Sequence, residues 1–192
     1  MRLWYLRRAV PWAALSGCAA VAVALVATAR RWPDTSGLVL PYALVACAAA
    51  AGFLMDESST PIVGVTARGG AWRLLSRLSG VVLPATLWLA LVVTVGDEAA
   101  SDRGSLVVAG VAACLLGAGV AALLHRAGIG RPGGLVAGAL VGVVTGWTVL
   151  GGFFGWQPLL PVHDAPSWVP VFWAGVGGVA LLAAAAGLRR TP

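Results

Sequence analysis

Few residues of this 192-residue chain could carry out catalysis or bind a metal. There are two histidines, His125 and His163, and the sequence places no serine or cysteine partner beside either. The three cysteines show no CxxC or Cys/His spacing, so they are interpreted as buried structural thiols. No GxxxxGK[ST] phosphate loop, HExxH zinc motif or GxSxG nucleophile turn occurs. We therefore expect no catalytic residue, metal site or cofactor in this chain.

The composition is that of an integral membrane protein. Hydrophobic residues make up 59% of the chain and charged residues 10%, with a mean hydropathy of +0.90. A soluble domain usually carries about 25% charged residues. The 13 basic residues are all arginine and the net charge is +6. Because the arginines lie at the ends of apolar runs, they indicate membrane topology rather than nucleic-acid binding.

Six apolar runs are long enough to cross a bilayer. About 20 helical residues, rising about 1.5 Å each, span a hydrocarbon core of about 30 Å. None of the runs contains Asp, Glu, Lys or Arg, and they cover residues 9–29, 37–55, 80–96, 104–124, 133–152 and 167–188. The third run is the shortest and is expected to extend into the segment before it. The sequence predicts an all-α bundle of six transmembrane helices in a single transmembrane domain, 1–192.

The arginines also predict the orientation of these spans. If the chain crosses six times, ten arginines fall on the side of the two termini, and three, Arg30, Arg31 and Arg103, fall on the other. The positive-inside rule then places both termini in the cytoplasm of a multi-pass cell-membrane protein. Leu15–Cys18 fits a lipoprotein cleavage site, but apolar sequence continues for eleven residues beyond Cys18. We therefore interpret this segment as the first span.

The longest predicted cytoplasmic connection is 56–79. It opens with acids, hydroxyls and Pro61, which is typical of a helix start. An apolar repeat further on predicts an amphipathic helix on the membrane surface, and its members are Ala71, Leu74, Leu75 and Leu78. Arg73 and Arg77 lie on another face. The connection is either an interfacial anchor or a docking element for a cytoplasmic partner.

The predicted external connection 153–166 is unusually apolar and aromatic. A solvated linker would not need this content, whereas short re-entrant helices in the outer leaflet would. A simple aromatic belt is the alternative.

Four glycines of the fifth span recur at intervals of four, at Gly134, Gly138, Gly142 and Gly146. They fall near one helix face and would admit another backbone closely. Packing within the bundle and packing across a dimer are both open.

The local run Gly52–Glu57, followed by Thr60-Pro61 and then arginines with Trp72, resembles the second-to-third-span loop of six-helix ABC-type export permeases of high-GC Gram-positive bacteria. The six-span topology is similar too. The resemblance implies a permease subunit without its own ATPase, paired with a second permease copy or a homologous permease. ATP and Mg²⁺ would bind a separate ATPase subunit, and the exported substrate would be hydrophobic or amphipathic.

The resemblance also implies roles for particular residues. ATPase docking is expected at Asp56, Glu57, Thr60, Pro61, Arg68, Arg73 and Arg77. Anchoring in lipid is expected at Trp72 and Leu75. An external gate is expected at Trp156, Gln157, His163 and Asp164.

Three other functions stay open. The substrate-binding membrane subunit of an energy-coupling vitamin importer has similar length and span number, although the first external loop here is short. A membrane accessory protein that transports nothing is the second. A membrane enzyme using His125 and His163 is the third.

Overall fold

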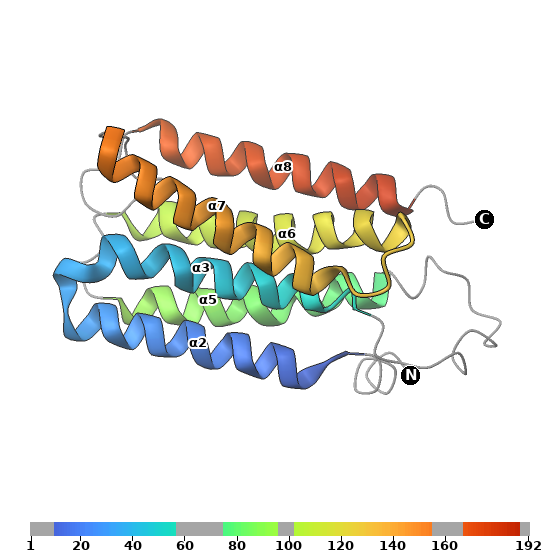
Figure 1. The fold of residues 1–192 in the computed structure, drawn as a ribbon, viewed down its shortest axis with the longest axis horizontal. Coiled ribbons are helices and arrows are strands. Elements are labelled where there is room, and N and C mark those ends of the chain that lie inside the picture. Colours follow the sequence, from blue (N-terminus) through green and yellow to red (C-terminus); the bar gives the residue numbers. More distant parts are fainter. Residues whose placement is uncertain (1–9, 57–74, 96–101, 155–166, 189–192) are drawn as a thin grey trace.

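The computed structural model describes residues 10–56, 75–95, 102–154 and 167–188, and these are helical with no strand among them. The elements in chain order are α2 (Trp12–Arg31), η1 (Pro33–Thr35), α3 (Ser36–Phe53), η3 (Ser79–Val81), α5 (Val82–Thr94), α6 (Arg103–Arg126), α7 (Pro132–Phe154) and α8 (Trp168–Leu188) (Figure 1). Six helical segments among the described residues are long and apolar enough to cross a membrane. The all-α class and the six predicted spans are thereby confirmed.

The third span begins earlier than its apolar run. Residues 75–78 are helical and lead through η3 into α5, so that the segment long and apolar enough to cross a membrane is Leu75–Thr94. This confirms the expected extension toward the preceding segment. The side chain of Leu75 is exposed, as an anchor in lipid requires. Residues 71–74 of the predicted surface helix, including Trp72, lie outside the described residues.

The helices form one bundle with alternating directions (Figure 1). Helix α2 begins at one end of the bundle, and α3 and α8 end there; we call this the Asp56 end. At the opposite end, which we call the Asp102 end, α2 leads through η1 into α3, and α6 begins. Helix α6 lies at the centre and packs against α3, α5, α7 and α8, whereas α2 packs mainly on α3.

Small residues on α6 allow neighbouring helices to approach its backbone. A methyl group added at Gly117 would lie 2.1 Å from the carbonyl oxygen of Ala48 on α3. One added at Gly119 would lie 2.9 Å from the carbonyl oxygen of Ala180 on α8. Such contacts supply the dispersion energy that holds apolar helices together where no hydrophobic effect acts between them. The glycines of α6 therefore set the helix spacing.

Trp88 fixes α5 to α6. Its ring is fully buried over Gly110, where an added methyl would lie 1.9 Å from the indole. The indole Nε1 donates a hydrogen bond of 2.9 Å to the carbonyl oxygen of Leu106. The ring thus contributes apolar area and satisfies its one polar atom inside the bundle.

Charged side chains form hydrogen bonds with backbone groups at the ends of several helices. The Asp102 carboxylate caps α6 by accepting from the Gly104 N–H at 2.9 Å and from the Ser105 hydroxyl. Arg103 donates to the carbonyl oxygen of Val95, just after α5, and Arg126 to that of Ala186 in α8. These bonds pair backbone groups that have no partner within their own helix.

Helix α6 ends in a Schellman motif. The Ile129 N–H donates to the carbonyl oxygen of Leu124 and the Gly128 N–H to that of His125. Gly128 has φ of +91°, a conformation that glycine adopts without steric cost. The chain then turns sharply enough for Pro132 to begin α7.

Gly117→Ala is expected to lower the free energy of unfolding by about 1–3 kcal/mol, because the new methyl group meets backbone atoms that cannot rotate away. Thermal unfolding in detergent, followed by circular dichroism, measures the change. Gly138→Ala is the matched control, since an added methyl there meets no atom within 4 Å. Equal unfolding temperatures for the two variants would contradict the close α3–α6 contact.

Candidate functional site

Asp56 joins the end of α3 to the beginning of α7. Its side chain is 8% exposed, and Oδ1 accepts a hydrogen bond of 2.6 Å from the Gly133 N–H. Gly133 follows Pro132, the first residue of α7, which cannot donate a backbone hydrogen bond. Asp56 therefore does for α7 what an N-cap side chain does for its own helix.

Arg77 makes a second hydrogen bond at the same place, to the backbone just after α3. It is 4% exposed, and its Nη1 donates a hydrogen bond of 2.8 Å to the carbonyl oxygen of Met55. Met55 is the second residue after α3, where carbonyl groups lack intrahelical partners. The described residues on either side of 57–74 thus include two buried polar side chains, Asp56 and Arg77, each hydrogen-bonded to backbone.

Opposing effects act on the pKa of the Asp56 carboxyl. Burial raises the pKa of the Asp56 carboxyl above its ordinary value. The Gly133 hydrogen bond and the nearby positive groups Arg131, Arg77 and His125 act in the lowering direction. The pKa of Asp102 at the opposite end is lowered instead, chiefly by its hydrogen bond with the Ser105 hydroxyl.

Two of the predicted docking residues therefore make contacts inside the bundle. Asp56 and Arg77 are buried, and each bonds to the backbone of a neighbouring helix end. The remaining predicted docking and gate residues lie outside the described residues, and they are Glu57, Thr60, Pro61, Arg68, Arg73, Trp156, Gln157, His163 and Asp164.

The glycines predicted to pack α7 lie open on the bundle. At Gly134, Gly138, Gly142 and Gly146 an added methyl would meet no atom of the described chain within 4 Å. The described part of the chain therefore supplies no close partner for these four glycines. Packing against a second chain stays a prediction.

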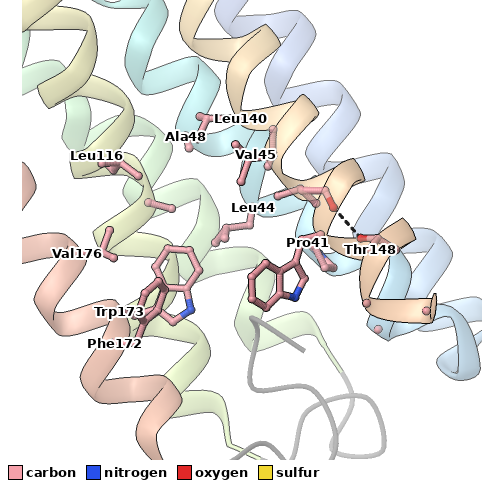
Figure 2. Close-up of a pocket in the computed structure, with 17 residues that line it drawn as sticks. Pro41, Leu44, Val45, Ala48, Leu116, Leu140, Thr148, Phe172, Trp173 and Val176 are labelled. Atoms are coloured by element: carbon pink, nitrogen blue, oxygen red, sulfur yellow. Dashed lines mark hydrogen bonds between the residues drawn. The ribbon is translucent and has the colours of Figure 1, made fainter. Parts of the chain in front are cut away.

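An apolar cavity of about 460 Å³ lies between the middle of the bundle and its Asp102 end. Helices α7 and α8 form its walls and are not packed against each other, while α3 and α6 lie between them. Figure 2 shows Phe172 and Trp173 on the α8 side, Leu140 and Thr148 on α7, and Leu44 among the residues between.

Polar groups near the cavity are few and mostly paired. The Thr148 hydroxyl donates a hydrogen bond of 2.8 Å to the carbonyl oxygen of Val144, drawn in Figure 2. The hydroxyls of Tyr42 and Thr145 lie 3.1 Å apart and join α3 to α7 beside it. Pro41 in α3 has no N–H, so the Gly37 carbonyl loses its usual intrahelical donor at this end. None of the described lining residues is charged.

Sequence reasoning missed this cavity. The available signals were Pro41 inside the second span and the adjacent Gly151 and Gly152 near the end of the fifth. Each leaves space or an unpaired carbonyl where four helices meet, but the sequence does not say which helices are neighbours.

Other candidate sites are weaker. A second apolar hollow of about 430 Å³ lies between α2 and α5 near the Asp56 end. Cys47 and Cys114 are buried free thiols, and Cys18 is partly buried. No cluster of three His, Cys, Asp or Glu residues that could hold a metal occurs among the residues that the structure describes. The His125 Nδ1 is buried without a hydrogen-bond partner there.

Comparisons with protein-family models, curated proteins and solved structures find no match to this chain.

Asp56→Ala is expected to lower the free energy of unfolding by about 1–2 kcal/mol, because the Gly133 N–H loses its buried acceptor. Chemical unfolding in mixed detergent measures it. Asp34→Ala, at an exposed position in η1, serves as the control and should change stability by less than about 0.5 kcal/mol.

The same carboxyl predicts a pH dependence. Because the folded-state pKa is raised, the folded protein keeps this proton to a higher pH than the unfolded chain does, so its stability falls as pH rises through that interval. The Asp56→Asn variant keeps an acceptor oxygen but cannot ionise, so its stability should depend less on pH over that interval. An unchanged or steeper fall in the Asn variant would contradict the assignment.

Proposed function

We propose that this chain is the membrane-spanning permease subunit of an ATP-driven exporter whose ATPase is a separate chain. The observation that supports this best is the anchoring of the connection 57–74. Asp56 before it is bound to α7, and Arg77 after it is bound to the end of α3. A partner that moves this connection would therefore act on both helices.

The same two helices form part of the apolar cavity. Leu44 and Val45 belong to α3, and Leu140 and Val144 to α7, whereas Phe172 and Trp173 belong to α8. A tilt of α3 and α7 relative to α8 would change the width of the cavity. In this proposal, a movement imposed at the Asp56 end tilts α3 and α7 and so changes the cavity nearer the Asp102 end, which holds a hydrophobic or amphipathic substrate.

An external energy source fits the described spans. Their charged residues lie at helix ends, as Arg103 and Arg126 do, rather than at the middle of a helix. Carriers driven by protons or sodium usually need ionisable or ion-binding groups at membrane depth. In this proposal the chain holds no cofactor, and ATP and Mg²⁺ bind the partner ATPase.

The proposed complex also contains a second permease, either a copy of this chain or a homologue. The open glycine face of α7, from Gly134 to Gly146, is a surface on which such a partner could approach closely. The Asp56 end would face the cytoplasm in the cell membrane, as the arginine distribution predicts.

A substrate-binding subunit of an energy-coupling vitamin importer is the second candidate. The position of the cavity favours it, since the predicted orientation places the Asp102 end outside the cell. Its lining offers few polar groups to recognise a water-soluble vitamin, which is why we rank it second.

The docking proposal predicts that Arg68→Glu with Arg73→Glu reduces copurification of an ATPase chain from native membranes about tenfold or more, because two complementary contacts become repulsive. Quantitative mass spectrometry of the tagged chain and its partners measures this. The matched control is Arg30→Glu with Arg31→Glu, which reverses two exposed charges at the opposite end.

Two results would contradict the proposal. One is ATPase recovery that is unchanged in the Arg68/Arg73 variant, with normal orientation verified by cysteine labelling. The other is labelling of the connection 57–74 from outside the cell.

A further inference from the structure

We propose that the cavity between α7 and α8 binds a single alkyl chain of a membrane lipid that enters sideways from the leaflet at the Asp102 end. This deepens the proposed function, because an alkyl-tailed lipid would then be the exported substrate. Binding to the cavity does not itself need an ATPase, so the two proposals can fail separately.

The length of the cavity matches one leaflet. Its α7 wall runs from Leu140 to Gly152, which is about 18 Å at about 1.5 Å per residue. Half of a hydrocarbon core is about 15 Å thick. The lining residues of α8 come from its half at the Asp102 end, and those of α3 begin at Gly37 and reach just past its middle, at Ala48. Most of the cavity therefore lies beside the alkyl chains of one leaflet.

The width of the cavity is sufficient for an alkyl chain. A volume of about 460 Å³ over that length leaves a mean cross-section of roughly 25 Å². Carbon atoms in contact lie about 3.5–4.0 Å apart, so an extended alkyl chain fits such a shaft.

The rim of the cavity opens toward lipid. Val143 on α7 is 63% exposed and Phe172 on α8 is 43% exposed, and both line the cavity. The aromatic cluster of α8 stabilises this rim, because Phe172 makes edge contacts with Trp168 and Trp173 at centroid distances of 6.1 and 5.7 Å. A lipid tail could enter between the two helices without leaving the bilayer.

The chemistry of the lining points the same way. The described lining residues carry no charge, and the Thr148 hydroxyl already donates within its own helix. The Gly37 carbonyl, which lacks its usual donor at Pro41, lies at the Asp102 end, where the polar head of a lipid would begin. The uncharged lining therefore binds the lipid tail, and the polar head lies at the Asp102 end of the cavity.

The experiment uses the full chain in phosphatidylcholine nanodiscs that contain a phosphatidylcholine with a diazirine in its palmitoyl chain. After illumination, mass spectrometry maps the labelled peptides. We expect label to concentrate on peptides that contain Leu44, Val144 and Trp173. Palmitoyl-lysophosphatidylcholine should displace it, and the octanoyl analogue should do so at least about tenfold less well, because fewer methylenes are buried.

Paired variants test the site. Val144→Trp fills the cavity and should reduce its labelling about tenfold, whereas Val141→Trp, on an exposed face of α7, should not. Val176→Phe from the α8 wall and its control Val179→Phe repeat the test should the first variant fold poorly. Labelling spread evenly over the lipid-facing helices, or unchanged by both filling variants, would overturn the inference.

Two further outcomes separate the proposals. Stronger displacement by a rigid sterol than by the palmitoyl lipid would overturn the alkyl-chain assignment. Specific cavity labelling, together with a copurified ATPase that the palmitoyl lipid leaves unstimulated, would uphold the inference and count against lipid export.

Discussion

The close approach of other helices to the backbone of α6 is the contact on which the rest of the bundle depends. Gly117 meets the Ala48 carbonyl of α3, Gly119 meets the Ala180 carbonyl of α8, and Trp88 of α5 covers Gly110. In lipid, apolar side chains gain little by leaving the hydrocarbon, so helices associate where backbones come close. Because α7 packs mainly on α3 and α8 packs mainly on α6, rather than on each other, a cavity remains between them.

Charge in this molecule is concentrated where helices end. Asp102 and Asp56 accept from the first N–H groups of α6 and α7, and Arg77, Arg103 and Arg126 donate to carbonyl groups at or just beyond the ends of other helices. Each pair satisfies a backbone group that would otherwise be costly near the hydrocarbon. Asp56 and Arg77, on either side of the connection 57–74, thus hold the ends of α3 and α7 by the same bonds that satisfy the backbone of those ends.

The sequence predicted the spans well because hydrocarbon thickness dictates the length of an apolar run. The bounds moved by a few residues where Trp, Arg or Pro begin or end a helix, and the third span gained Leu75–Ser79. The packing was not predictable in the same way. A membrane helix is apolar on nearly every face, so periodicity does not show which face meets a neighbour.

The glycines illustrate that limit. Regular spacing on α7 suggested a packing face, yet the closest glycine contacts with other helices are at Gly110, Gly117 and Gly119 of α6, where spacing is irregular, and at Gly133, which is outside the α7 series. Likewise Asp56 and Arg77 were singled out as docking residues from their types and position, but only the fold shows that they are buried and bonded to helix ends. The cavity was missed for the same reason, since it depends on which helices are not neighbours.

The most direct measurement is an electron cryomicroscopy map of the protein in lipid nanodiscs, bound to a rigid fragment if its size requires one. The account predicts the indole of Trp88 seated on Gly110 and elongated density between the facing walls of α7 and α8. A map in which those two helices touch along their length, with the space beside Leu44 closed, would contradict it.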